Sequence, residues 1–142
     1  MTVKHLLEQK DRNVWTIDPD ATVLDAVAKM AKKDVGSLVV MEGEKLVGIV
    51  TERHYSRNVI LKGKTSPTTL VRDIMERNVI HVRPEHSIEL CMTLMTDKRV
   101  RHLPVLEGTK VIGIISIGDL LKFIISKKEF DIDQLEHYIQ GR

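Results

Sequence analysis

The sequence predicts an α/β fold, in the broad sense that includes α+β, built from two tandem β-α-β-β-α repeats packed about a pseudo-twofold axis. Residues 16–60 align with residues 81–125 at a constant offset of 65, without a gap. Within each copy, apolar β-rich runs alternate with apolar stripes at helical spacing. A single copy of about 60 residues rarely buries enough surface to be stable alone, so we expect the two copies to cover each other.

The first half of each copy is expected to be a short strand followed by a helix. In the first copy, residues 14–17 run into Asp18-Pro19, a turn signal because the residue before proline is held in extended geometry. Thr22 is suited to cap the helix that follows. The apolar positions of that helix recur at helical spacing: Val23, Ala26, Val27 and Met30.

The second half of each copy is expected to be a hairpin and a last helix. Residues 37–41 and 46–50 are apolar and rich in β-branched residues, and residues 42–45 (Glu-Gly-Glu-Lys) are typical of a hairpin turn. We expect the last helix to begin near Thr51. It should end at Gly63, because glycine is favoured just after the C-terminus of a helix.

The domain boundaries follow from the repeat. We expect residues 1–62 to form the first repeat, residues 63–70 a linker with Gly, Ser and Pro, and residues 71–126 the second repeat. Residues 127–142 lie beyond the repeat, and their apolar residues at positions 132, 135 and 139 predict a short amphipathic helical tail. Such a helix would cover the edge of the molecule or pack on a second chain. Docking of a regulated partner is the alternative interpretation.

The composition narrows the classes of function. The net charge is +2, which is too small for a dedicated nucleic-acid surface, and an aromatic content of 4% argues against a base-stacking platform. Cys91 is the single cysteine, and its apolar neighbours predict an inert core thiol. The first residues are charged where a secretory signal would be apolar, and no apolar run is long enough to span a membrane. We therefore expect a cytoplasmic protein without a membrane segment.

The sequence offers no set of residues typical of catalysis or of metal binding. No two of the six histidines have the i, i+4 spacing of a helical metal pair. A G-x-S-x-G elbow, a phosphate-binding loop and a nucleophile with its base are also absent from the sequence. We therefore expect a protein that is not an enzyme and holds no metal.

One constellation recurs in both copies, at the corner between the last strand and the last helix. Residues 48–54 (Gly-Ile-Val-Thr-Glu-Arg-His) and 113–119 (Gly-Ile-Ile-Ser-Ile-Gly-Asp) place a hydroxyl at the corner and a polar group three residues later. As a cap, Ser116 would accept helix N–H groups and Asp119 would complement the helix dipole, stabilising by about 0.5–2 kcal/mol. As a binding site, the N–H groups would hold an anion and Asp119 a ribose diol. The residues alone leave both interpretations open.

Together with residues 35–40 (Val-Gly-Ser-Leu-Val-Val) and 100–105 (Val-Arg-His-Leu-Pro-Val), these motifs resemble a cystathionine-β-synthase (CBS) domain pair, or Bateman module, over roughly residues 1–126. The resemblance implies a regulatory sensor that binds an adenosine-containing ligand between the repeats: AMP, ADP, ATP, NAD(H) or S-adenosylmethionine. It also implies a disc-shaped homodimer of two CBS pairs. Ligand binding would be transmitted as a conformational change or as a change in partner binding, and the partner would be an unidentified regulated enzyme. The alternative is a structural dimerisation adaptor with vestigial nucleotide sites.

The resemblance also implies two crossed sites, each with the base on one repeat and the ribose and phosphate on the other. In the main site, the base would lie on the first repeat: Val14, Trp15, Thr16, Val35, Gly36 and Ser37. The second repeat would bind the ribose through Asp119 and the phosphates through its other residues: Arg101, His102, Ser116 and Gly118.

The second site is expected to be weaker or empty. It would combine residues of both repeats: Val79, Ile80, His81 and Val100 with Thr51, Arg53 and His54. His54 stands where the family carries an aspartate, and a neutral imidazole offers one acceptor where a carboxylate offers two oxygens. Arg101 adds bulk where the first repeat has Gly36. We therefore expect one strong site and one weak site.

Several of these residues have a second interpretation. Trp15 is either a core or rim aromatic at a strand edge or a stacking surface for adenine. Arg53 is either a surface residue of the first helical turn or a phosphate ligand. Two cationic or polar groups at the mouth of a buried strand, Arg101 and His102, indicate an anion. The small net charge thus hides basic groups gathered at the expected phosphate end: Arg53, Arg99, Arg101 and His102.

Overall fold

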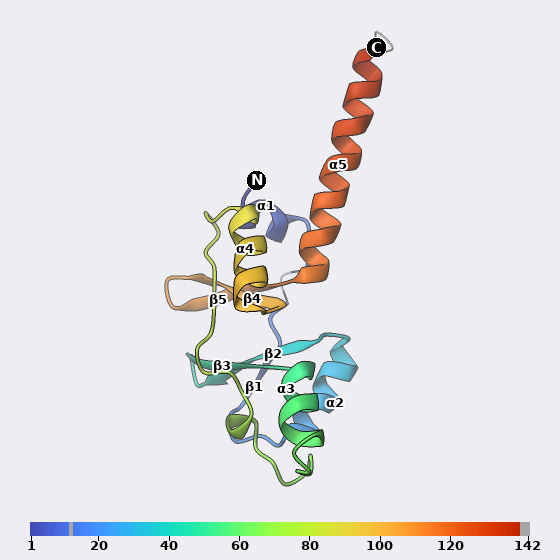
Figure 1. Cartoon of the computed structure of the whole chain (residues 1–142). Helices are drawn as coiled ribbons and strands as arrows, with labels where there is room; N and C mark the ends of the chain where they lie inside the picture. The colour runs from blue at the N-terminus through green and yellow to red at the C-terminus, as the bar shows by residue number, and fades with distance from the viewer. Residues whose placement is uncertain (12, 140–142) are drawn as a thin grey trace.

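The computed structural model describes residues 1–11 and 13–139 of the 142-residue chain. Its elements are, in chain order, α1 (Val3–Glu8), β1 (Thr16–Ile17), α2 (Val23–Lys33), β2 (Ser37–Glu42), β3 (Lys45–Thr51), α3 (Glu52–Tyr55), η1 (Ser56–Ile60), η2 (Val71–Asp73), α4 (Ile88–Lys98), β4 (His102–Glu107), β5 (Lys110–Ser116) and α5 (Ile117–Ile139). The two halves lie one above the other, with their sheets toward the middle and their helices outside (Figure 1). The predicted mixed α and β class is confirmed.

The strands form one small sheet in each half. In the first half the order is β1-β2-β3, with β1 parallel and β3 antiparallel to β2, whereas β4 and β5 form an antiparallel hairpin in the second half. Gly43 and Gly108 turn the two hairpins with φ values of 62° and 63°. Glycine adopts this left-handed conformation without steric cost, which explains the predicted turn at residues 42–45.

The described part of the second half has no strand equivalent to β1, and pairing there is reduced to an isolated bridge between Val82 and Val105. In the first half, the Val39 N–H donates to the Trp15 carbonyl at 3.1 Å. Pro104 stands at the equivalent position and has no N–H to donate. The proline therefore accounts for the shortened pairing.

The helices α2 and α4 are matched at both ends. The hydroxyls of Thr22 and Ser87 each accept the backbone N–H three residues on, at 3.1 and 3.0 Å, so the predicted cap at Thr22 is confirmed. Each helix ends at a residue with left-handed backbone, Asp34 with φ 54° and Arg99 with φ 55°. Equivalent positions of the two repeats thus adopt the same unusual conformation with different side chains.

The last helices of the two halves differ. In the first half, α3 is followed by the π-helical η1, and the chain then turns at Gly63 with φ 69°. In the second half, α5 runs unbroken from Ile117 to Ile139 and extends away from the body (Figure 1). The helix expected beyond residue 127 is the continuation of α5, and residues 140–142 lie outside the described residues.

Each half has its own core, and each core takes in a segment from the start of the other repeat. We call residues 1–8 and 69–76 the exchanged segments. The first segment packs into the core of the second half through Val3, Leu6 and Leu7. The second segment packs into the core of the first half, and its buried residues are Val71, Ile74 and Met75. The two halves are therefore interlocked.

Two glycines in β3 and β5 make room for the exchanged segments. A Cβ built at Gly113 would lie 2.8 Å from Cδ2 of Leu7, and one at Gly48 would lie 2.7 Å from Sδ of Met75. The backbone follows the same exchange, because the N–H of residue 3 donates to the carbonyl of residue 86 and the N–H of residue 71 to that of residue 21. The exchange thus obeys the same pseudo-symmetry as the repeat.

Candidate functional site

The strand-to-helix corners of the two repeats have the same hydrogen bonds. In the second repeat, Oγ of Ser116 accepts the Asp119 N–H at 3.1 Å, and Oδ2 of Asp119 accepts the Ser116 N–H at 2.9 Å. In the first repeat, Oγ1 of Thr51 accepts the His54 N–H at 3.3 Å, and the Thr51 N–H donates to Nδ1 of His54 at 3.1 Å. The capping interpretation of both corners is therefore correct.

A cleft of about 240 Å³ lies between the two repeats, and we call it the Trp15 cleft. Its lining residues come from both repeats and from the segment after α1: Lys10, Asn13, Trp15, Asp34, Val35, Gly36, Ser37, His102, Ile114, Ser116 and Asp119. Seven of them belong to the main site predicted from sequence. The structure thus brings together a base side from the first repeat and a ribose side from the second, as a crossed site requires.

Four residues predicted for the main site do not line this cleft. Val14 and Thr16 flank Trp15, and Thr16 is paired with Val39 in the first sheet. Gly118 lies in the first turn of α5, and Arg101 faces the neighbouring cleft described below. The ligand roles expected of these four residues stay predictions.

Lys10 is a cleft residue that sequence reasoning missed. Its Nζ lies 2.7 Å from Oδ2 of Asp119 and donates to the carbonyl of Ile114 at 2.5 Å. Burial alone would raise the pKa of Asp119, but the hydrogen bonds from Lys10 and from Ser116 hold the pKa below its ordinary value. Lys10 reaches the second repeat because it directly follows α1, which packs there. No local pattern in the sequence signals that placement.

Trp15 combines the two interpretations considered for it. The ring is half-buried and packs against the core of the first half, yet it also lines the cleft. Nζ of Lys33 lies 4.2 Å from the ring centroid, a cation–π contact that occupies one side of the indole. A ligand in the cleft would therefore meet a ring that is already held in place.

A second cleft, of about 310 Å³, lies next to the first, and we call it the arginine cleft. Its lining residues are Gly36, Ile49, Thr51, Glu52, Arg53, His54, Arg57, Glu76, Lys98, Arg99, Val100, Arg101 and His102. It contains four residues of the predicted weaker site: Thr51, Arg53, His54 and Val100. The two clefts share Gly36 and His102, and a Cβ at Gly36 would lie 3.3 Å from Nε2 of His102.

Three residues predicted for the weaker site lie elsewhere. Ile80 packs against the core of the second half, and His81 lines a different hollow near the hairpin turns. Val79 is half-buried and does not line the arginine cleft. The segment that carries these residues lacks the strand pairing of β1, because Pro104 has no N–H to donate to it. Its geometry therefore differs from that of the equivalent segment in the first repeat.

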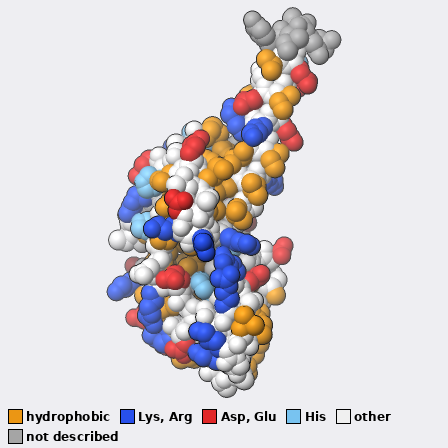
Figure 2. Space-filling view, in the orientation of Figure 1, with side chains coloured by type: hydrophobic (Ala, Val, Ile, Leu, Met, Phe, Trp, Pro, Cys, Tyr) orange, Lys and Arg blue, Asp and Glu red, His pale blue; other side chains and the backbone are white. Residues whose placement is uncertain are grey.

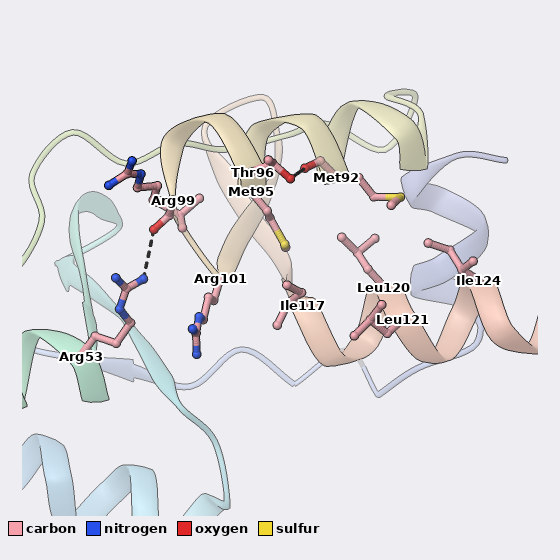
Figure 3. A pocket seen from close by; sticks show the side chains of 11 residues that line it. Arg53, Met92, Met95, Thr96, Arg99, Arg101, Ile117, Leu120, Leu121 and Ile124 are labelled. Carbon is pink, nitrogen blue, oxygen red and sulfur yellow. Dashed lines mark hydrogen bonds between the residues drawn. The ribbon is translucent and has the colours of Figure 1, made fainter.

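Neighbouring charges and burial shift the pKa values of two residues in the arginine cleft, Arg53 and His54. Arg53 donates from Nη1 to the carbonyl of Arg99 at 3.1 Å (Figure 3). The positive charge of Arg57, followed by burial and then by the charge of Arg101, lowers the pKa of Arg53. Burial lowers the pKa of His54, an effect that Glu76 opposes. Figure 2 shows Lys and Arg side chains gathered where the two halves meet.

An apolar groove of about 320 Å³ runs between α4 and α5 (Figure 3). Apolar side chains of the two helices line it, including Met92, Met95, Leu120 and Leu121, and the lining also contains Arg53, Arg99 and Arg101. Cys91, on α4, is buried in the core of the second half, and burial raises the pKa of its thiol to about 11. The thiol is therefore protonated at neutral pH, as expected of an inert core cysteine.

Within residues 1–11 and 13–139, no three His, Cys, Asp or Glu side chains are placed so that they could hold a metal ion. No helix of this described part is long and apolar enough to cross a membrane.

Two interlocked α and β repeats with two clefts between them define a tandem-repeat module. The chain belongs to the CBS domain family, whose model matches residues 3–60 and 71–126. It is 39% identical over 150 residues to the mitochondrial CBS domain-containing protein CBSX3 of Arabidopsis thaliana, covering 99% of this chain and 72% of the relative. CBS domain pairs are regulatory, signal-transduction modules, which agrees with the resemblance stated from the sequence.

Solved structures share the fold. A candidate signal-transduction protein with CBS domains from Burkholderia ambifaria superposes with a TM-score of 0.87 at 46% identity, covering 89% of this chain and 95% of the other. The CBS domain pair of MJ0100, in complex with 5′-methylthioadenosine and S-adenosyl-L-methionine, superposes with a TM-score of 0.80 at 22% identity, covering 89% and 98%. At that identity the second likeness concerns the fold alone.

Proposed function

We propose that this protein is a sensor that binds an adenosine-containing nucleotide, such as AMP, ATP or NAD(H), in the Trp15 cleft. The observation that carries the proposal is the meeting of Trp15 and residues 35–37 of one repeat with Ser116 and Asp119 of the other around one cavity. The adenosyl ligands of MJ0100, a relative in fold, support the same ligand class. The protein acts by binding and not by catalysis.

The cleft residues divide the proposed ligand between them. The indole of Trp15 offers a flat apolar surface to the adenine ring. The carboxylate of Asp119 can accept two hydrogen bonds from the ribose diol, once the diol replaces Lys10 as its partner. Ser37 is 5% exposed and lies at the start of β2, where its hydroxyl lines the base side of the cleft.

Ligand binding can change the relative arrangement of the two halves because the Trp15 cleft lies between them. Both repeats line it, so a ligand that contacts both sides favours one relative arrangement of the two halves over others. A ligand shifts such an equilibrium only by its difference in affinity for the two arrangements. The regulated partner in this proposal is an enzyme that responds to that arrangement. The predicted compartment is the cytoplasm, whereas the Arabidopsis relative is mitochondrial.

The homodimer is part of the same proposal. Ile117, Leu121 and Ile125 follow one another at one-turn spacing on α5 and are 44%, 52% and 54% exposed. Met92 on α4 is similarly exposed beside the groove between the two helices. A second copy that presents the same face would bury this stripe in an isologous interface.

A thermal-shift experiment tests the sensor. The purified chain is heated with AMP, ATP, NADH or S-adenosylmethionine, and a ligand at 100 times its Kd should stabilise the protein by about 2.7 kcal/mol. Asp119→Ala should abolish the ligand-induced shift, whereas His54→Ala, at the equivalent corner, should reduce it less. Stability without ligand is measured for each variant, because both changes also remove a helix cap.

The adaptor alternative gives a different result. If no adenosyl ligand shifts the melting temperature of the wild-type chain, the sensor is wrong and a structural adaptor with vestigial sites is favoured. An unchanged shift in Asp119→Ala would leave that residue with its capping role alone.

A further inference from the structure

The outer part of α5 exposes apolar side chains that nothing in the described part of the chain covers. Residues 127–137, which we call the α5 tail, are all exposed, with Ile132 at 57% and Leu135 at 58%. At 100° per residue these two side chains share an arc of about 80° with Leu121 and Ile125. The apolar stripe of α5 therefore continues along the tail, beyond the body of the molecule (Figure 1).

The stripe has the spacing that lets one helix pack along another. Positions on this face are separated by alternating steps of four and three residues, the repeat of a coiled coil: 121, 125, 128, 132 and 135. Lys128, in the middle, is the single charged residue among them. Phe130 lies on the opposite side of α5, where Nζ of Lys127 is 5.5 Å from its ring centroid. The stripe thus fits one partner helix.

Charge is unevenly distributed along α5, with lysines near the body and acidic residues further out: Lys122, Lys127 and Lys128 before Glu129, Asp131, Asp133 and Glu136. Lys127 pairs with Asp131 inside the helix at 2.9 Å. No described cation lies at ion-pair distance from Glu129 or Glu136. Two parallel copies of α5 would bring like charges together, with Lys128 facing Lys128. Antiparallel copies would bring the acidic part of each helix to the basic part of the other.

The body supplies further cations at the place that an antiparallel tail would reach. Three arginines that line the groove between α4 and α5 gather at the end where α5 begins: Arg53, Arg99 and Arg101 (Figure 3). None of the three forms an ion pair with a carboxylate of the described residues. The groove follows residues 117–124 over about 10 Å, and residues 127–136 span about 14 Å. The tail is therefore long enough to cover the groove and bring its acidic end to the arginines.

We propose that the α5 tail docks in antiparallel orientation along α5 and the adjoining groove of a second copy, which docks its own tail in the same way. Ile132 then faces Leu121 of the second copy. Glu129 lies near Lys122 of that copy, and Glu136 reaches the arginine end of its groove. One twofold axis generates both contacts. The inference rests on the homodimer of the proposed function and adds its orientation and the segment that each copy contributes; it does not depend on the nucleotide.

Oxidative cross-linking of cysteine variants tests the orientation. The native thiol, Cys91, is buried, so an engineered surface cysteine reacts in its place. Leu121→Cys and Ile132→Cys are purified separately, mixed and oxidised, and mass spectrometry without reductant detects the products. The mixture should form a disulfide-linked heterodimer, and each variant alone should form at least fivefold less linked dimer. Phe130→Cys is the matched control, because its mixture with Leu121→Cys should stay unlinked.

The outcomes separate this inference from the proposed function. Efficient linking of Ile132→Cys with itself would show a parallel pair and overturn the docked tail. A wild-type dimer by light scattering, with no link in the mixture, would also overturn it and leave the homodimer standing. A monomeric wild type would overturn both. Linking in a chain that no adenosyl ligand stabilises would contradict the sensor and support the docked tail.

Charge reversal tests the contact between Glu129 and Lys122. Glu129→Lys and Lys122→Glu should each weaken the dimer by about threefold to tenfold, because like charges then face each other across the twofold axis. The double variant restores opposite charges and should recover most of the affinity, measured by sedimentation at low salt. Glu44→Lys, at an exposed position of the first hairpin, is the control with the same change in net charge as Glu129→Lys and should dimerise as the wild type does. Additive losses in the double variant would contradict the antiparallel contact.

Discussion

Asp119 illustrates how one carboxylate serves structure and proposed function together. The same oxygen, Oδ2, accepts the Ser116 N–H of the helix cap and the ammonium of Lys10. Both side chains of the ion pair are largely buried, with 25% of Lys10 and 30% of Asp119 exposed. A ribose diol would therefore have to compete with Lys10 for the carboxylate. The free cleft holds an internal cation at the place where the proposed ligand would bind.

Replacing Lys10 by Met should strengthen the binding of adenosine, because the diol then meets a carboxylate without a competing ammonium. An ion pair of this exposure contributes about 1 kcal/mol or less, so the affinity should rise by up to about fivefold. Titration calorimetry with adenosine measures the change. Adenosine is chosen because it has no phosphate with which Lys10 could interact.

Lys10→Arg is the matched control, since it keeps a cation beside Asp119 and should leave the affinity near that of the wild type. Weaker adenosine binding in Lys10→Met would show that Lys10 is a ligand contact and not a competitor.

At the residue level, several residues that line the Trp15 cleft were predicted from the sequence, but some of the charged residues in the two clefts were not. Trp15, Gly36, Ser116 and Asp119 could be named because the resemblance to a CBS domain pair implies ligand roles for them. Lys10 could not, because it sits in a charged segment of ordinary composition and is brought to the cleft by the packing of α1. Cations of the neighbouring cleft, such as Arg57 and Lys98, likewise lie outside the recurring motifs.

At the level of elements, the exchanged segments connect stability in one half to residues at the start of the other. Leu7 is 2% exposed and packs over Gly113 in β5, at a place where no Cβ would fit without displacement. Met75 and Gly48 form the equivalent contact in the first half. The core into which each segment packs could be seen only in the structure.

Leu7→Ala should destabilise the protein by about 2–5 kcal/mol, the usual cost of truncating a buried leucine. The loss should be felt first in β4 and β5, although residue 7 belongs to the first repeat in sequence. Hydrogen exchange measures it, with amide protection expected to fall more in the second half than in the first.

Met75→Ala is the counterpart in the other half and should reverse the pattern, with β2 and β3 losing more protection. Equal loss of protection across both halves in each variant would mean that the two cores unfold as one unit. It would contradict the expectation that each exchanged segment stabilises mainly the half into which it packs.

The predicted elements differ from the structure where a single residue alters the local backbone hydrogen bonding. The cap of α2 and the turn at Gly43 depend on local chemistry and were predicted correctly. Pro104 lacks the N–H that its counterpart Val39 uses to bind the first strand, and the predicted symmetry of the two sheets is reduced accordingly. α5 continues past the repeat because residues 117–139 contain no proline and no glycine after its first turn.

At the level of the whole molecule, α4 and α5 present an exposed apolar face. The stripe along α5 and the adjoining groove together form an apolar surface beside the arginine cleft. Arg53, Arg99 and Arg101 line both the groove and that cleft (Figure 3). A second copy bound here would therefore lie close to the arginine cleft.

Leu121→Glu should convert the dimer into a monomer, because it places a charge in the centre of the proposed interface. Size-exclusion chromatography with light scattering measures the mass. Phe130→Glu is the control, since residue 130 is 57% exposed but lies on another side of α5 at 100° per residue. A wild-type monomer, or a Leu121→Glu dimer, would contradict this interface.

The exchanged segments also set an order of events during synthesis. α1 leaves the ribosome first, but the core that receives it is complete only when β5 and the start of α5 have emerged. The first half can close earlier, once residues 69–76 are available. Until the second half is made, the apolar side chains of α1 have no native partner, a state in which nascent chains are prone to aggregation and depend on chaperones. The contacts of greatest sequence separation thus form last.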